Sequence, residues 1–319
     1  MLNDLLSIFA SPEFYQAVLR MATPLLLAAM GGLVAERAGL VTFSMEGMML
    51  MGAVGGVIGS HLTGSVWGGL LLAVIFGMLA GLTYAVMAVS IGAHQIVTCV
   101  ALNMGAMGLT SVLFGLVFGG GSGAVVQDVI QVASLSPWKI PLLGEIPILG
   151  PIFFNHIPLV YLAFLTVPAV WFLLYRTTWG LKIRAVGEHP HAADALGISV
   201  VRVRYLTLLF AGAFAGLAGA FLSIGVLNTW QENMTSGRGF IAYTAIVFGK
   251  WQPLGVLLGA LLFGLADALQ LRVQTMNIAI PYQAMVAFPY VVTLLALILF
   301  SGKASWPAAS GQAFKREGK

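Results

Sequence analysis

Long apolar runs separated by short polar stretches dominate this chain, and their length gives the first indication of its architecture. A helix needs about 20 apolar residues to cross the hydrocarbon of a bilayer. The runs lie at about residues 14–35, 42–60, 66–91, 95–118, 157–175, 204–227, 239–250, 252–271 and 284–300. This pattern predicts an all-α integral membrane protein, a polytopic helical bundle of about eight or nine spans.

Two of these runs do not fit a simple crossing. Residues 239–250 are too few to cross the bilayer as one helix, and residues 42–60 carry Glu46 within a glycine-rich sequence. Short or glycine-interrupted segments are typical of broken helices in transporters. Their irregular backbone is tolerated only where it lines a cavity or packs against protein. We therefore expect broken or short helices at both places.

The longest internal polar stretch, residues 176–204, contains five of the fifteen Lys and Arg residues. Within it, Pro190 opens and Gly197 closes an alanine-containing octapeptide, which is typical of the start and stop of a short helix. We predict an amphipathic element along the membrane surface between Gly187 and Gly197, and we expect it to dock a soluble partner. The alternative is a solvated connection whose basic residues only set the orientation of the chain.

Composition excludes a water-soluble protein. Of the 319 residues, 59% are hydrophobic and 8% are charged, whereas soluble domains are about a quarter charged. The pI near 9.3 is better explained by basic residues that flank membrane spans than by a nucleic-acid partner. The single Cys99 excludes a disulfide framework or a thiol metal cluster. The acidic N-terminus, with Asp4 and Glu13, argues against a cleaved signal peptide.

The distribution of Lys and Arg also predicts an orientation. Placing residues 176–204 in the cytoplasm puts most basic residues on that side, provided that residues 239–250 count as a crossing. The N-terminus then lies outside and the C-terminus inside. Residues 1–302 form one transmembrane domain, with an external loop at residues 119–156 and a cytoplasmic coupling loop at residues 176–204. Residues 303–319 form a short cytoplasmic tail that we expect to be frayed.

Polar residues inside the apolar spans are the candidates for a substrate pathway. A carboxylate at a helix centre costs about 2.5 to 3.5 kcal/mol on insertion scales, so Glu46 must face protein or water. We favour a structural bond from Glu46 to free backbone amides at a helix break over a proton relay or a substrate contact. Ser44, Thr98 and Asn103 could bond a polar substrate near the midplane, and bonding between helices is an equally good explanation for them. Gln231 is a further candidate, which we expect at the outer mouth of the pathway.

No catalytic machinery is evident in the sequence. No lysine outside the tail has the glycine spacing and the following Ser or Thr of a phosphate-binding loop, and no HExxH motif is present. The chain is therefore predicted not to be an enzyme and to need no cofactor or metal. If transport is driven by ATP, we expect the hydrolysis to take place on a separate chain.

Four segments of the sequence resemble a known family. Residues 35–41 (AERAGLV) and 44–53 (SMEGMMLMGA) are similar to the signature of permease subunits of bacterial nucleoside ABC importers. Residues 185–198 (AVGEHPHAADALGI) resemble the coupling motif of the wider branched-chain amino-acid and simple-sugar permease superfamily. Residues 239–249 (GFIAYTAIVFG) match the nucleoside branch again. The resemblance covers nearly the whole chain and the order of its segments.

The resemblance implies half of the translocation pathway of a heteromeric importer in the bacterial cytoplasmic membrane. The implied partners are a second related permease subunit, cytoplasmic ABC ATPase subunits that dock on the coupling loop, and an extracytoplasmic binding lipoprotein that delivers a nucleoside. The residues expected to couple to the ATPase are Arg184, Gly187, Glu188, Pro190, Ala193, Asp194 and Gly197.

Two departures from the family pattern affect these expectations. Thr42 and Phe43 occupy the region where the family usually has Asn, which leaves the substrate open, and His189 replaces the common Asn of the coupling motif. A simple-sugar or branched-chain amino-acid permease is the alternative within the superfamily. A stand-alone carrier driven by an ion gradient through Glu46 is the alternative from another class.

Overall fold

Helices account for almost all of the regular structure in a computed structural model of the chain. The structure describes residues 9, 11–119, 133–139, 149–274, 283, 291–292, 295 and 306–314. The helices of the first half are α2 (Pro12–Glu36), α3 (Met45–Thr63), α4 (Val66–Ala85), η1 (Val86–Ile91), α5 (Gln95–Phe118) and α6 (Leu149–Phe153). Those of the second half are α7 (Pro158–Arg176), α8 (Thr178–Glu188), α9 (Pro190–Ala195), α10 (Val200–Ala220), η2 (Phe221–Leu227), α11 (Arg238–Phe248) and α12 (Pro253–Gln274). Two short strands, β1 (Trp138–Lys139) and β2 (Asn155–His156), pair antiparallel.

Six helices in the described part of the chain are long and apolar enough to cross a membrane. They are Pro12–Glu36, Val66–Ile91, Gln95–Phe118, Pro158–Arg176, Val200–Leu227 and Pro253–Gln274. Together with the shorter apolar helices, they confirm the predicted all-α polytopic bundle. The last predicted span, 284–300, lies outside the described residues except at three positions, and the predicted loop 119–156 is described only in part.

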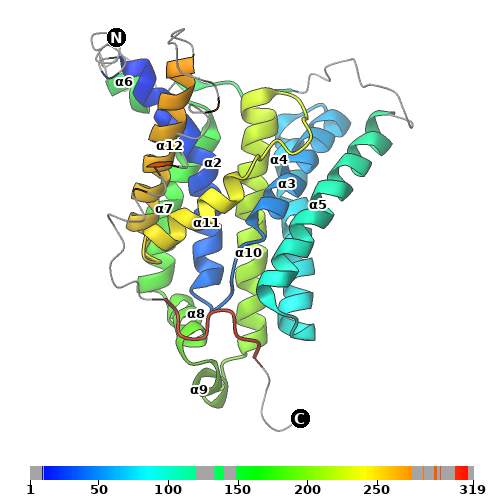
Figure 1. Cartoon of the computed structure of the whole chain (residues 1–319), viewed down its shortest axis with the longest axis vertical. Coiled ribbons are helices and arrows are strands. Elements are labelled where there is room, and N and C mark those ends of the chain that lie inside the picture. Colours follow the sequence, from blue (N-terminus) through cyan, green and yellow to red (C-terminus); the bar gives the residue numbers. More distant parts are fainter. Residues whose placement is uncertain are drawn as a thin grey trace.

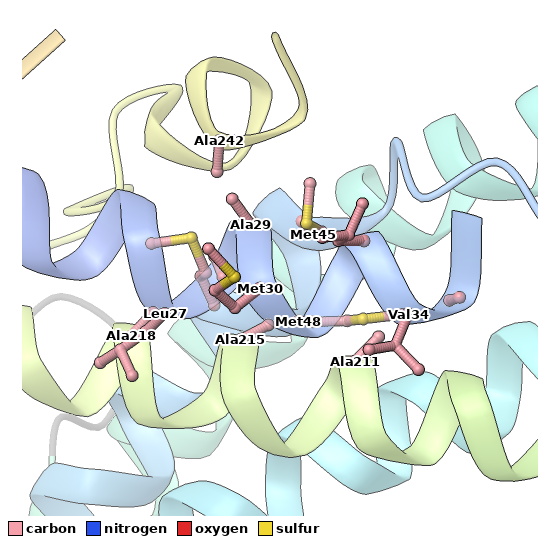
Figure 2. Close-up of a cluster of buried hydrophobic side chains, with 14 of the residues drawn as sticks. Leu27, Ala29, Met30, Val34, Met45, Met48, Ala211, Ala215, Ala218 and Ala242 are labelled. Carbon is pink, nitrogen blue, oxygen red and sulfur yellow. The ribbon is translucent and has the colours of Figure 1, made fainter. Parts of the chain in front are cut away.

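The core forms around α2, which Figure 2 shows between α10 and α11. Leu27, Met30 and Val34 of α2 point toward alanines of α10, and Ala29 points toward Ala242 of α11. All five of these side chains are buried. The small alanines let α10 and α11 lie close to α2. In lipid the hydrophobic effect does not drive helices together, so they associate through close packing of small residues.

Glycines bring α10 still closer to α3 and α4. A Cβ placed on Gly52 of α3 would lie 2.3 Å from the Cα of Gly216 on α10. One placed on Gly77 of α4 would lie 2.2 Å from the carbonyl oxygen of Gly212 on α10. These distances leave no space for a side chain, so the helices contact one another through their backbones, as small residues allow in lipid.

Two helices begin between the ends of the bundle and not at its surface (Figure 1). An irregular link at residues 37–44 rises from the end of α2 to the start of α3, and a second link at residues 228–237 leads into α11. The 11 residues of α11 extend about 16 Å, roughly half of the hydrocarbon thickness. The break predicted within 42–60 therefore precedes Met45, and the glycines after it do not interrupt α3.

The polar stretch at 176–204 is mostly helical, which corrects its description as a loop. Thr178–Glu188 form α8, which was not expected, and α10 begins at Val200. The predicted short helix is present as α9, which starts at Pro190 and is followed by Gly197 at φ +82°. Both α8 and α9 lie at one end of the bundle (Figure 1), here named the α9 end.

Candidate functional site

The side chain of Glu46 holds the N-terminus of α11. Glu46 lies in the first turn of α3 and is 4% exposed. Its Oε1 accepts hydrogen bonds from the Thr235 hydroxyl and from the Gly237 amide (2.8 Å), and its Oε2 accepts one from the Gly239 amide (2.7 Å). The first amides of a helix have no partner within that helix. Glu46 supplies those partners with both oxygens, which favours its structural role over a proton relay.

Asn103 of α5 supports the first turn of α3 in a similar way. Its Oδ1 accepts a hydrogen bond from the Gly47 amide (2.8 Å), and its Nδ2 donates one to the Phe43 carbonyl (3.0 Å). Ser44 is buried at the N-cap position of the same helix, without a side-chain capping bond. The structure thus brings Ser44, Glu46 and Asn103 together where α3 begins.

Thr98 and Gln231 are placed differently from these three residues. Thr98 is half-buried on α5 and donates its hydroxyl to the His94 carbonyl (3.0 Å), one turn earlier in its own helix. Gln231 is exposed on the 228–237 link. Their roles in a substrate pathway stay predictions.

A second buried carboxyl group, Glu36, fastens the start of the 37–44 link, and sequence reasoning did not select it. Its Oε1 accepts hydrogen bonds from the Thr42 amide (2.7 Å) and hydroxyl (3.0 Å), and its Oε2 accepts one from Trp251 Nε1 (3.1 Å). Trp251 and Lys250 both adopt left-handed backbone conformations (φ 53° and 50°), which are uncommon for residues other than glycine. Glu36 therefore joins the α11–α12 turn to the link before α3.

Arg37 and Gly187 connect the same link to α8. Arg37 Nε donates a hydrogen bond to the Trp251 carbonyl (2.8 Å), and its Nη2 donates one to the Tyr175 hydroxyl (3.3 Å). A Cβ on Gly187 would lie 2.1 Å from the Arg37 carbonyl oxygen. Only a residue without a side chain fits at this crossing, so Gly187 sets how closely α8 approaches the 37–44 link.

The residues predicted to couple to an ATPase differ in their exposure. Glu188 and Gly197 are exposed, whereas Ala193 is buried against the rest of the chain. Arg184 lies with its guanidinium carbon 5.2 Å from the centre of the Tyr175 ring. Leu196, which sequence reasoning did not select, is 82% exposed beside Gly197.

Pro190 and Asp194 shape α9 itself. Pro190 is in the first turn of the helix, where its missing N–H costs nothing. The Asp194 carbonyl accepts a hydrogen bond from the Gly197 amide (2.9 Å) and closes the helix. Both residues therefore act on the shape of α9 through the backbone.

Residues 306–314, here named the C-terminal strap, pack against the α9 end, which corrects the expectation of a frayed tail at this place. The Ala309 amide donates a hydrogen bond to the Gly187 carbonyl (2.9 Å), and the Ala308 amide donates one to Glu188 Oε2 (3.3 Å). The buried Arg204 of α10 donates from Nη1 to the Gln312 carbonyl (2.9 Å). In Figure 1 the strap is the red segment beside α8 and α9.

A cleft of about 440 Å³ lies between α9 and the C-terminal strap. Its lining residues come from the end of α8, from α9 and from the strap, and are Glu188, His189, Pro190, His191, Ala192, Ala308, Ala309 and Gln312. His191 also approaches Phe314, with 5.1 Å between their ring centres. The strap therefore forms one wall of the surface that α9 presents.

The sequence profile of the branched-chain amino acid transport system permease component matches residues 14–300 of this chain. Three relatives are similar over most of their length. The guanosine ABC transporter permease protein of Bacillus subtilis is 39% identical over 92% of this chain and 94% of its own. The nucleoside ABC transporter permease protein of Lactococcus lactis is 35% identical over 91% and 92%. A permease protein provisionally assigned to a glucose ABC transporter in Haloferax volcanii is 40% identical over 85% and 80%. No solved structure matches the chain.

Proposed function

Since this chain belongs to the family of permease components of branched-chain amino acid transport systems, we propose that it is the permease subunit of an ATP-driven nucleoside importer. The observation that carries the proposal is the similarity to the guanosine permease, which extends over 94% of that protein. The glucose-assigned relative is 40% identical, against 39% for the guanosine permease, but it aligns over a smaller share of both chains. A second nucleoside permease, from Lactococcus lactis, adds to the support for nucleosides.

In the proposed topology, the α9 end faces the cytoplasm of a multi-pass protein in the cytoplasmic membrane. Arg37, Lys250 and the five basic residues of 176–204 belong to segments at or near this end, which agrees with the excess of Lys and Arg in cytoplasmic loops. The N-terminus then lies outside and the C-terminal tail at 303–319 inside. The 228–237 link and α11 together make the crossing that α11 alone is too short to make.

The proposed partners are two ABC ATPase subunits, a second permease subunit and an extracytoplasmic binding lipoprotein. The ATPase would dock on the surface formed by the end of α8, by α9 and by the residue after it, where Glu188, His191 and Leu196 are exposed. Movement of α9 would pass to α8, in which Gly187 is in tight contact with Arg37 of the 37–44 link. That link leads to α3 and Glu46. ATP can shift the permease between its states only by stabilising one of them, so these contacts must differ between inward-facing and outward-facing forms.

The substrate class is tested by competition in cells that express the complete importer. We expect uptake of labelled guanosine to be blocked by an excess of other nucleosides and to be unaffected by glucose or leucine. Glucose or leucine uptake that guanosine does not compete with would assign the chain to another branch of the family.

Replacing Glu188 with lysine is expected to reduce uptake at least tenfold while the chain still inserts in the membrane. The substitution removes the acceptor of the Ala308 amide and reverses a charge on the docking surface, where like charges oppose association. Uptake should be measured beside Glu13→Lys as a control, because the Glu13 side chain is 78% exposed and surface ion pairs contribute little. Normal uptake by Glu188→Lys would contradict the coupling role.

Removing the C-terminal strap by truncation after residue 305 is expected to lower uptake several-fold. The truncation leaves the Gly187 carbonyl and Glu188 Oε2 without the amides of Ala309 and Ala308, so α9 loses one wall of its surface. Truncation after residue 314 keeps the strap and serves as the control. Equal uptake by the two truncated chains, at equal abundance in the membrane, would show that the strap is dispensable.

A further inference from the structure

Three aromatic rings gather where α3 and α11 begin. The ring centre of Phe43, in the 37–44 link, lies 5.2 Å from that of Phe240 and 4.8 Å from that of Tyr243. Phe240 and Tyr243 are three residues apart on α11, so they lie on the same face of the helix. The other face of α11 is buried and consists of Gly239, Ala242, Ala245 and Ile246. Phe43, Phe240 and Tyr243 are here named the aromatic triad.

The position of the aromatic triad argues against contact with lipid. Irregular backbone adjoins it on both sides, from the 37–44 link and from the 228–237 link, and both links end between the two ends of the bundle (Figure 1). Backbone of this kind is tolerated at membrane depth only when protein covers it or when it lines a water-filled cavity. Phe240 is nevertheless 37% exposed within this chain. The exposed part of Phe240 therefore faces protein or a water-filled cavity of the assembled importer, and not lipid.

The side chains of Glu46 and Asn103 next to the triad are already engaged, and the Ser44 hydroxyl is completely buried. Both oxygens of Glu46 accept hydrogen bonds from the residues that lead into α11. Both polar atoms of the Asn103 side chain bond the start of α3. Recognition at this point therefore depends on the rings and on the Tyr243 hydroxyl, which can both donate and accept a hydrogen bond.

We propose that the aromatic triad is the surface on which the base of a nucleoside stacks as it passes the midplane, an inference that rests on the proposed function. Every base has a π-face, so aromatic side chains can stack on any of the nucleoside bases. In secondary transporters, broken helices near the midplane typically form the substrate site. A hexose, in contrast, presents hydroxyl groups that would need several free polar side chains.

The test measures the guanosine concentration that gives half-maximal uptake by the complete importer. Phe240→Leu should raise this concentration roughly tenfold, the loss expected when one ring is removed from a base–aromatic stack. Phe240→Tyr keeps the ring, so by the same argument its half-maximal guanosine concentration should lie within about twofold of the wild-type value. The control is Phe172→Leu, because Phe172 is 58% exposed on α7 and lies outside the triad. Free guanine should compete in the wild-type importer, and ribose should not.

The outcomes separate this inference from the proposed function. If guanosine uptake by Phe240→Leu has the same half-maximal concentration as Phe172→Leu, the stacking surface is wrong although the importer is a nucleoside importer. Competition by ribose in place of guanine would also overturn it. A wild-type importer that takes up no nucleoside would overturn the proposed function and the inference together. If Phe240→Leu does not reach the membrane, Tyr243→Leu gives the same comparison.

Discussion

Replacing Glu46 with alanine is expected to abolish transport and to destabilise the protein by roughly 3 kcal/mol or more, because each buried donor left without a partner costs about 1 to 3 kcal/mol. Three donors lose their acceptor in this variant, from the Thr235 hydroxyl and the amides of Gly237 and Gly239. Glu46 is almost completely buried, so water cannot readily replace it. The N-terminus of α11 should then detach from α3.

Thermal unfolding in detergent and nucleoside uptake measure the two parts of this prediction. Glu46→Gln keeps one carbonyl acceptor and should recover part of the stability. The control is Glu13→Ala, which removes a surface carboxylate 3.7 Å from Arg272 and should change stability by at most about 1 kcal/mol. A Glu46→Ala variant as stable as Glu13→Ala would show that Glu46 does not hold α11. Transport that stops in Glu46→Gln without loss of stability would instead indicate a role in the transport cycle itself.

Replacing Gly187 with valine is expected to uncouple the permease, with uptake falling at least tenfold. Its Cβ would lie 2.1 Å from the Arg37 carbonyl oxygen, and overpacking of a tight contact costs typically about 1 to 3 kcal/mol. The backbone of α8 must move away from the 37–44 link, and the amide of Ala309 must follow or lose its bond to the Gly187 carbonyl. Substrate-stimulated ATP hydrolysis by the assembled importer should fall together with uptake.

Gly105 offers a matched control for this experiment. It lies within α5, and a Cβ placed on it would meet no atom within 4 Å. Alanine in a helix interior is more favourable than glycine by roughly 0.5 to 1 kcal/mol, so Gly105→Ala should retain uptake and stability. Uptake by Gly187→Ala should already be impaired, because the Cβ of alanine would clash with the Arg37 carbonyl oxygen. If Gly187→Ala and Gly105→Ala transport equally well, the close contact with Arg37 does not matter for coupling.

Much of the fold follows from the length of the apolar runs. Because a membrane span must be long and apolar, the spans can be located from the sequence alone. Six of the described helices match predicted spans. The two irregular links also had a visible cause. Residues 239–250 are too short to cross, and the buried Glu46 needed partners that a broken helix provides.

Long-range contacts could not be predicted from these local signals. The bond from Trp251 to Glu36 joins residues 215 positions apart, and the bond from Ala309 of the C-terminal strap to Gly187 joins residues 122 positions apart (309 − 187). Neither contact leaves a periodic pattern in the sequence from which it could be predicted. The available hints for the first contact were Glu36 and Arg37, at the end of α2 and the start of the first link, and Trp251 after Lys250. For the aromatic triad, the spacing of Phe240 and Tyr243 was visible, but their contact with Phe43 depends on the fold.

The measurement that tests the account most directly is nucleoside uptake into proteoliposomes that contain this chain, its partner permease and the ATPase. We expect accumulation of labelled guanosine that requires both ATP on the ATPase side and the binding protein on the other side. We also expect proteoliposomes with this chain alone to take up nothing under a proton or sodium gradient. Uptake by the chain alone under such a gradient would contradict the account and make the protein a secondary carrier.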